Sequence, residues 1–579
     1  MTTHHEPAAA PLGYPEATDK GLKGGSLGLL SSVVVGLAST APAYSLAASL
    51  GLVVASGGAV LAGVKAPAIM LLAFIPMYFI AVAYAELNKA EPDCGTTFTW
   101  AARAFGSWVG WMGGWGVIAA DVIVMANLAQ IAGAYSFTFV GDLGWHAAAD
   151  LASNTFWATF AGVVWIAVMT WICYRGIEVS AKVQYGLLAI EVVVLVIFSI
   201  TALAKIYSGH GESTSLHPSL SWLWPGGLSF GDVIAPAILA AVFIYWGWDT
   251  AVTTNEEADD PATTPGRAAV ISTLLLLLIY ALVSTAAVAF AGVGTDGIGL
   301  GNADNAGDVF RAIGPALFGD SFLGKVGLIL LSASILTSAS ASTQTTILPT
   351  ARTALSMGAY KALPNSFTRI HPRFLTPTVA TVGMGVVSAV FYVLFTLVSS
   401  SLLLALIGSV GLMIAFYYGL TGFACVWFYR RTLTDSARHF LMRGALPLAG
   451  GVILFAAFIY ALKNYAAADW LQDDDGKNVT ILGMGAVAFV GIAALVLGFV
   501  LMLVWRVMAP DYFTPGEPLG RRGYHDLILA GVAMEDETVR LPDSGLPDIV
   551  IAPDLSNLPE GATAIDIETG EEVRRPPTE

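Results

Sequence analysis

An aspartate stands at the end of an otherwise apolar segment, Phe243-Ile244-Tyr245-Trp246-Gly247-Trp248-Asp249-Thr250. A carboxylate in such a segment is costly in lipid unless it faces protein or a water-filled cavity, where it can bind a cation or carry a proton. Gly247 beside it indicates an interrupted helix, and half-helices broken at mid-membrane line the substrate sites of many secondary transporters. The predicted binding residues of this segment are Phe243, Ile244, Tyr245, Trp246, Gly247 and Asp249.

The first apolar segment contains a second interruption, where small residues and hydroxyls surround Pro42. Proline lacks a backbone donor and clashes with a carbonyl one turn earlier, so the helix is expected to kink or unwind there. N–H groups freed at the start of the next half-helix suit an anion, and freed carbonyls suit an ammonium. An ordinary membrane-helix kink is the alternative. The predicted binding residues here are Ala38, Ser39, Thr40, Ala41, Pro42 and Ala43.

The elements that must position these residues follow from composition. The chain is 56% hydrophobic and only 12% charged, whereas soluble domains carry about 25% charged residues. Its repeated apolar runs are each close to the roughly 20 residues that span a bilayer. The sequence therefore predicts an all-α integral membrane protein with twelve transmembrane helices, at 26–56, 66–86, 97–139, 155–174, 181–206, 231–255, 267–292, 321–351, 378–398, 401–429, 444–463 and 480–507.

The two interrupted helices open the two halves of the chain, as expected for inverted repeats. Lysine and arginine collect in alternate loops, which predicts that both termini are cytoplasmic. The last segment holds fifteen acidic and five basic residues, which is typical of a largely disordered tail, with a regulatory tail as the alternative. The predicted organisation is a cytoplasmic segment 1–25, a first repeat 26–206, a second repeat 207–430, two appended helices 431–507 and the acidic tail 508–579.

Two further acids fall inside predicted helices, Asp121 and Glu191. Intramembrane ionisable groups usually line ion or substrate paths. With Asp249 they form the predicted coupling residues. A cavity shared by all three would favour a cationic substrate, such as a basic amino acid or a polyamine. Glu191 is either a proton carrier, since burial raises a carboxyl pKa, or a paired and static group.

The chain resembles the amino acid–polyamine–organocation permease superfamily, of the bacterial amino acid permease type, over roughly residues 25 to 510. Four motifs in the family's order carry this likeness. They are Pro92-Asp93-Cys94-Gly95-Thr96-Thr97-Phe98-Thr99-Trp100 with Ala104-Phe105-Gly106 and Gly114-Trp115, residues 176–184 ending Ala181-Lys182-Val183-Gln184, Gly247-Trp248-Asp249 with Glu256 and Pro261, and residues 352–377 with Leu363-Pro364, His371-Pro372-Arg373 and Thr376-Pro377.

The resemblance implies a LeuT-like fold with a 5+5 inverted repeat and discontinuous first and sixth helices. It also implies that backbone N–H groups at Ser39 to Ala43 hold a substrate carboxylate. Carbonyls near Ala38 and around Ile244 and Tyr245 would then meet the amine. Phe243 or Trp246 would close over the bound molecule as an aromatic lid.

One position departs from the family pattern. Several proton-coupled members carry a lysine seven residues after the position of Gln184, in place of a sodium ion, and this chain has Glu191 there. A carboxylate cannot replace that positive charge. In sodium-coupled relatives of the wider fold, hydroxyls of the eighth helix complete a sodium site, and Ser338 and Ser342 are the candidates here.

The predicted function is secondary active transport of amino acids or related amines across the plasma membrane, with proton coupling and alternating access. The alternatives are an exchanger of polyamines or cationic amino acids, and a non-transporting amino acid sensor. No Walker-type loop or nucleophile motif indicates a pump or an enzyme. No cofactor, other metal or nucleic-acid partner is predicted, and the three dispersed cysteines are expected to be small core residues. The sequence does not indicate an oligomeric state.

Overall fold

The chain forms two compact units. The larger spans Asp19–Met534, and the smaller combines Met1–Thr18 with Glu535–Glu579. In the smaller unit the described residues form two antiparallel strands, β3 (Thr563–Ile565) and β4 (Glu572–Arg574). The computed structural model describes residues 20–56, 62–398, 400–472, 476–514, 519, 563–565 and 572–574.

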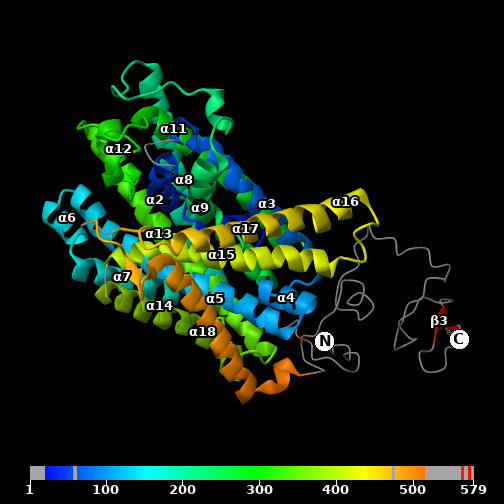
Figure 1. The fold of residues 1–579 in the computed structure, drawn as a ribbon. Coiled ribbons are helices and arrows are strands. Elements are labelled where there is room, and N and C mark those ends of the chain that lie inside the picture. Colours follow the sequence, from blue (N-terminus) through cyan, green and yellow to red (C-terminus); the bar gives the residue numbers. More distant parts are fainter. Residues whose placement is uncertain are drawn as a thin grey trace, which may run out of the picture. The chain divides into compact units, whose positions relative to one another are not determined.

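The larger unit is a bundle of long helices (Figure 1). Twelve described segments are long and apolar enough to cross a membrane, which confirms the predicted number. The first half contains α1 (Leu29–Ser39), α2 (Pro42–Val54), η1 (Gly63–Lys65), α3 (Ala66–Ala90), α4 (Thr97–Phe105), α5 (Ser107–Asp142), α6 (His146–Ala152), α7 (Thr155–Tyr174) and α8 (Ile177–Tyr207).

The second half repeats the pattern of a broken helix followed by continuous ones. Its elements are η2 (Leu220–Leu223), η3 (Phe230–Ile234), α9 (Ala235–Val242), η4 (Phe243–Tyr245), α10 (Thr250–Thr253), η5 (Asn255–Glu257), α11 (Thr264–Ala291), η6 (Ala303–Asn305), α12 (Val309–Phe318), α13 (Phe322–Ala359), η7 (Asn365–Thr368), α14 (Thr378–Val398) and α15 (Ser400–Phe428). The remaining elements are α16 (Ala437–His439), η8 (Phe440–Ala445), α17 (Leu446–Tyr465), β1 (Thr480–Ile481), β2 (Met484–Gly485), α18 (Ala486–Met508) and η9 (Pro510–Phe513).

Several predicted helix limits change. The predicted helix 97–139 is divided at Gly106, whose φ of 98° lies in a region that favours glycine, so α4 and α5 are separate. The helix predicted to end at residue 351 continues to Ala359 as α13. The helix predicted to begin at residue 480 begins at Ala486, because β1 and β2 pair as a hairpin before α18.

The first span lies at the centre of the bundle. Its most apolar window is 94% buried, compared with 28% for α7 and α14. The half-helix α1 packs against α8, α11 and α13, and α13 runs along α5. A helix surrounded by other helices can place polar groups at mid-depth without exposing them to lipid, which is the position that a transport site requires.

Candidate functional site

The first helix is interrupted at Thr40 and Ala41, as predicted. Ala41 adopts a left-handed conformation with φ 47°, and α2 begins at the next residue, Pro42. The N–H groups of Thr40 and Ala41 donate to the carbonyls of Leu37 and Ala38, both at 3.2 Å, and these bonds close the end of α1. The proline therefore opens a second half-helix rather than only kinking a continuous one.

The start of α2 holds the carboxylate of Glu191. Pro42 contributes no N–H, so Ala43 and Tyr44 carry the next donors. The Ala43 N–H donates to Glu191 Oε1 at 2.7 Å, and the Tyr44 N–H donates to Ser338 Oγ at 3.1 Å. The Ser338 hydroxyl donates in turn to the same Oε1 at 2.7 Å. Glu191 is fully buried on α8, so residues of α2, α8 and α13 form one polar group.

The sixth helix is also interrupted, over Trp246 to Asp249. The helical segment η4 ends at Tyr245, Trp246 is extended, and Gly247 has φ 113° before α10 begins at Thr250. The carbonyl of Ile244, released by the break, accepts a hydrogen bond from the Tyr280 hydroxyl at 2.6 Å. The two discontinuous helices that the sequence predicts are therefore present.

The two interruptions touch each other. The Ser39 and Thr250 hydroxyls lie 2.9 Å apart, and the Ser342 hydroxyl donates to the Ser39 carbonyl at 2.9 Å. A Cβ placed on Gly247 would lie 2.8 Å from the carbonyl oxygen of Ser39. Only glycine fits here, because both the backbone angle and the contact exclude a side chain.

Replacing Gly247 with alanine should remove most transport activity and lower stability by about 1–3 kcal/mol, since the new Cβ forces the two interruptions apart. Uptake into proteoliposomes and the melting temperature check this. Gly383→Ala on α14 is the matched control, because no atom lies within 4 Å of its added Cβ. Equal uptake by the two variants would contradict the predicted role of the contact.

Asp249 is held by two tyrosines that the sequence analysis missed. The hydroxyls of Tyr417 and Tyr418, both on α15, donate to Asp249 Oδ2 and Oδ1 at 3.1 and 2.9 Å. The indole N–H of Trp246 donates to the Tyr417 hydroxyl. A pair of adjacent tyrosines inside an apolar helix was the available signal, because buried phenols need polar partners.

The predicted lid aromatics are buried. Phe243 is 6% exposed and Trp246 is 7% exposed. Tyr245 packs edge-on against Tyr280, with ring centroids 4.9 Å apart. The role of Phe243 or Trp246 as a lid stays a prediction.

The three intramembrane acids have separate partners. The Asp121 carboxylate accepts a hydrogen bond from Thr350 on α13 at 2.6 Å, Glu191 lies at the start of α2, and Asp249 lies against α15. Among the described residues the three carboxylates do not form a group whose oxygens all lie within 4.8 Å. Each acid thus has hydrogen-bond partners of its own, and a cavity shared by all three, with its preference for a cationic substrate, stays a prediction.

The two serines predicted for a sodium site both lie against the first-helix interruption. Ser338 contacts Glu191 and the Tyr44 N–H, and Ser342 contacts the Ser39 carbonyl. Sodium prefers such oxygen ligands, as other hard cations do. The sodium site stays a prediction.

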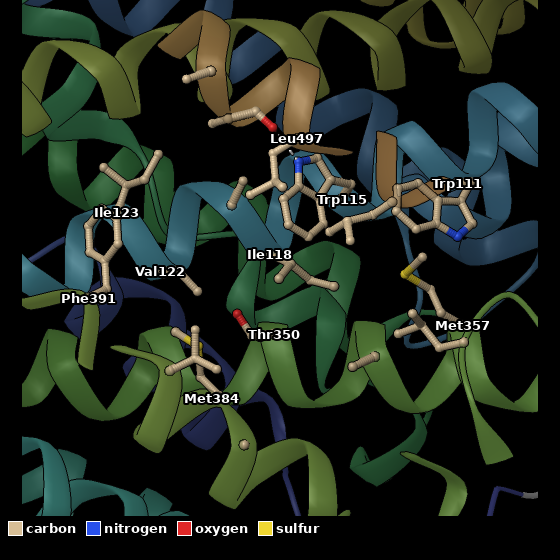
Figure 2. A pocket seen from close by; sticks show the side chains of 18 of the residues that line it. Trp111, Trp115, Ile118, Val122, Ile123, Thr350, Met357, Met384, Phe391 and Leu497 are labelled. Carbon is tan, nitrogen blue, oxygen red and sulfur yellow. Dashed lines mark hydrogen bonds between the residues drawn. The ribbon is translucent and has the colours of Figure 1, made fainter. Parts of the chain in front are cut away.

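A cavity of about 720 Å³ lies elsewhere, between α5, α13, α14 and α18 (Figure 2). Its lining is almost wholly apolar and includes Trp115, Met384 and Leu497. Thr350 also lines it, although its hydroxyl is bonded to Asp121. The cavity borders neither helix interruption, so we do not assign it to the transported substrate.

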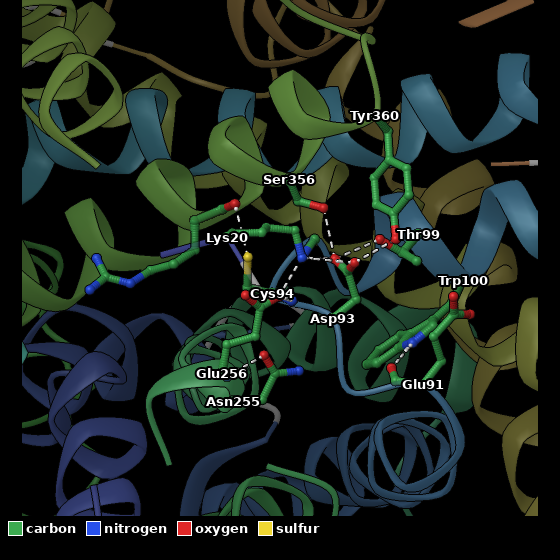
Figure 3. A network of polar contacts seen from close by, with 12 residues as sticks. Lys20, Glu91, Asp93, Cys94, Thr99, Trp100, Asn255, Glu256, Ser356 and Tyr360 are labelled. Atoms are coloured by element: carbon green, nitrogen blue, oxygen red, sulfur yellow. Dashed lines mark hydrogen bonds and ion pairs between the residues drawn. The ribbon is translucent and has the colours of Figure 1, made fainter. Parts of the chain in front are cut away.

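A polar network around Lys20, the first described residue, joins four segments of the chain (Figure 3). The Lys20 ammonium bonds Asp93 Oδ2 at 3.0 Å and also bonds Glu256. Asp93 Oδ1 accepts hydrogen bonds from Thr99 and Ser356 at 2.9 and 2.7 Å. This network therefore holds together four parts of the chain: those before α1, before α4, after α10 and at the end of α13.

The Asp93 carboxylate and the Lys20 ammonium each favour the charged form of the other. Burial alone would raise the pKa of the Asp93 carboxyl, but Lys20 and the Ser356 hydroxyl lower it below its ordinary value. Burial opposes the Lys20 charge, yet Asp93 and Glu256 raise its pKa well above the usual value. Ligand atoms of Asp93, Cys94 and Glu256 lie within 4.8 Å, as in a metal site. The Lys20 ammonium supplies positive charge beside Asp93 and Glu256, as a metal ion would.

A backbone tie accompanies this network. The N–H groups of Ser26 and Leu27 donate to the Glu257 carbonyl at 2.9 and 3.0 Å, and the Asp259 N–H donates to the Leu27 carbonyl at 3.0 Å. The chain entering α1 and the chain leaving α10 therefore form a short parallel β-bridge between Leu27 and Ala258.

Comparisons with known proteins agree with this architecture. MhsT in complex with L-phenylalanine superimposes with a TM-score of 0.50 at 16% identity, covering 73% of this chain and 98% of that one, which shows a LeuT-like fold. An uncharacterized transporter of Mycobacterium tuberculosis (strain H37Rv) is 26% identical over 80% of this chain and 90% of its own. The branched-chain amino acid permease BcaP of Bacillus subtilis is 25% identical, over 69% of this chain and 81% of its own.

The family itself follows from a match over most of the chain. The family described as "Amino acid permease" matches residues 27–489, which include both interrupted helices and the spans that surround them. These relatives are transporters rather than enzymes. With twelve membrane-spanning segments built around two broken helices, this multi-pass membrane protein belongs to the amino acid permease family.

Proposed function

We propose that this protein is a secondary active transporter that moves amino acids or related amines across the plasma membrane by alternating access. Proton movement drives the cycle, and both termini face the cytoplasm. One observation carries this proposal. Two interrupted helices from different halves of the chain meet at Ser39 and Gly247, and each break places a buried carboxylate beside unwound backbone. Such half-helices form transport sites at mid-membrane.

The substrate class rests on the family. Its relatives include proteins named as transporters of branched-chain amino acids, of glutamate and serine, of cationic amino acids and of methylthioribose. A zwitterionic amino acid suits the two breaks, because helix starts favour a carboxylate and free carbonyl lone pairs favour an ammonium. Exchange of polyamines or cationic amino acids is the second candidate.

Proton coupling would act through Asp249 and Glu191. An ionised carboxylate only accepts hydrogen bonds, whereas a protonated one has one donor and less acceptor capacity. Protonation of Asp249 would therefore weaken its bonds from Tyr417 and Tyr418, and loosen the sixth helix from α15. Protonation of Glu191 would similarly weaken its bond from Ala43. Either change favours a different arrangement of the broken helices.

The test is acidification-driven uptake of amino acids into proteoliposomes. We expect Asp249→Asn and Glu191→Gln to reduce proton-driven accumulation at least about tenfold, while substrate exchange without a gradient continues, because the carrier loses its proton rather than its site. Undiminished proton-driven accumulation in both variants would exclude these residues from coupling. Ligand binding without any flux by the full-length wild-type protein would favour a sensor over a transporter.

A further inference from the structure

The start of α2 has no donor left for a substrate. The first N–H groups of a helix have no partner within the helix and form its anion-binding end. Here Pro42 has none, the Ala43 N–H binds Glu191, and the Tyr44 N–H binds Ser338. The Ser45 N–H donates to the Ala41 carbonyl at 2.8 Å, as in the helix interior. The position is therefore filled by groups of the protein itself.

The group that fills it is chemically equivalent to the carboxylate of an amino acid. Glu191 Oε1 accepts both the Ala43 N–H and the Ser338 hydroxyl at 2.7 Å. Glu191 Oε2 is buried and has no hydrogen-bond partner among the described residues. A carboxylate with one oxygen fully engaged and the other unsatisfied is held less completely than a structural ion pair, so exchange with another anion costs less.

The surroundings offer Glu191 little other charge. The helices packed against α8 include α1, α2, α7, α11, α12 and α13. Of these, α1, α2 and α7 contain no Asp, Glu, Lys or Arg. The charged residues on the other three are Arg267 in the first turn of α11, Arg311 on α12, and Lys325 and Arg352, each more than ten residues from Ser338 along α13. Their other titratable groups are phenols and thiols, of Tyr44, Cys173, Tyr174 and Tyr280.

We propose that Glu191 is an intramolecular competitor of the substrate carboxylate. It occupies the start of α2 while the site is empty, and it must release the Ala43 N–H before an amino acid carboxylate binds there. Two carboxylates cannot share these donors, and their like charges repel without a cation between them. This inference rests on the proposed function and names the step at which substrate and protein compete.

The competition predicts a gain of affinity on mutation. Glu191→Gln keeps the shape of the side chain but replaces a charged acceptor by a neutral one, and neutral hydrogen bonds are about half as strong. The substrate carboxylate then displaces it more easily. An amine without a carboxylate does not need the start of α2, so its affinity should stay unchanged.

The experiment compares amino acids with their decarboxylated amines: leucine with isopentylamine, serine with ethanolamine, and lysine with cadaverine. Dissociation constants are measured by calorimetry on the purified full-length protein at one pH. We expect Glu191→Gln to bind the amino acid of each pair about tenfold more tightly than the wild type does. The dissociation constant of the amine should stay within about threefold of the wild-type value. Glu191→Ser, too short to reach Ala43, should show the same gain.

The control is Glu178→Gln, the same substitution on the same helix at an exposed position that pairs with Lys23. It should bind both members of each pair as the wild type does. Unchanged or weaker binding of amino acids by the Glu191 variants would overturn the inference and leave the proposed function intact. An equal gain for amines would also overturn it. Failure of the wild type and every variant to bind any of the six compounds would contradict the proposed function, and the inference with it.

Discussion

An Arg352→Met variant should be less stable than the wild type by about 3–5 kcal/mol, the usual cost of removing one partner from a buried ion pair. The Arg352 guanidinium makes two bonds to the Glu257 carboxylate, Nε to Oε2 and Nη2 to Oε1, both at 2.8 Å. Both side chains are 0% exposed. Methionine fills a similar volume but leaves the Glu257 charge buried and unpaired. Melting temperatures of the purified protein in one detergent check this result.

The matched control for Arg352→Met removes the cation of an ion pair that is exposed to solvent rather than buried. Lys361 and Asp511 lie 3.3 Å apart with side chains 56% and 66% exposed, so Lys361→Met should change stability by no more than about 1 kcal/mol. The double variant Arg352→Met with Glu257→Gln should recover much of the loss, because no unpaired charge remains. Equal melting temperatures for Arg352→Met and Lys361→Met would contradict the prediction.

Replacing Lys20 with methionine should open the polar network of Figure 3 and expose Cys94. The Lys20 side chain is 2% exposed and bonds two carboxylates, Asp93 and Glu256. Without the ammonium these carboxylates repel each other, and an uncompensated buried charge costs about 3–5 kcal/mol. Cys94 follows Asp93 in the sequence, and its thiol is fully buried. The backbone N–H of Cys94 donates to Glu256 Oε1 at 3.0 Å. The alkylation rate of this thiol should rise at least about tenfold.

The labelling experiment uses a background in which Cys173 and Cys425, the other two cysteines, are serine. A water-soluble maleimide then reports on Cys94 alone. Lys23→Met is the control, because Lys23 lies three residues away and pairs with Glu178 in an exposed position. If Cys94 reacts at the same rate in the Lys20 and Lys23 variants, the ammonium does not hold this end of the bundle closed.

Both helix interruptions could be predicted from sequence because their causes are local. Pro42 removes a donor, and Gly247 permits a backbone angle that other residues avoid. The twelve spans were predictable for a similar reason, since length and apolarity decide whether a helix crosses a bilayer. The break at Gly106 was missed because glycine is common inside membrane helices and its angle depends on the packing of α4 against α5.

The partners of the acids could not be predicted in the same way. Glu191 bonds to Ala43 and Ser338, each almost 150 residues away, and Asp249 bonds to tyrosines almost 170 residues away. Such pairs depend on which helices become neighbours and on how each is rotated about its axis. An apolar helix has little amphipathic pattern to fix that rotation. The sequence therefore indicated three acids inside helices, but not the groups that each of them contacts.

The backbone tie between Leu27 and Ala258 is made by main-chain atoms alone. Exchanging one ordinary side chain for another does not remove it, and proline is the residue that would delete a donor there. Sequence drift can therefore change the composition of both segments while the entrance to the first helix stays fastened to the exit of the sixth. The linkage of the two broken helices therefore tolerates changes of side chain, whereas side-chain contacts such as that of Lys20 do not.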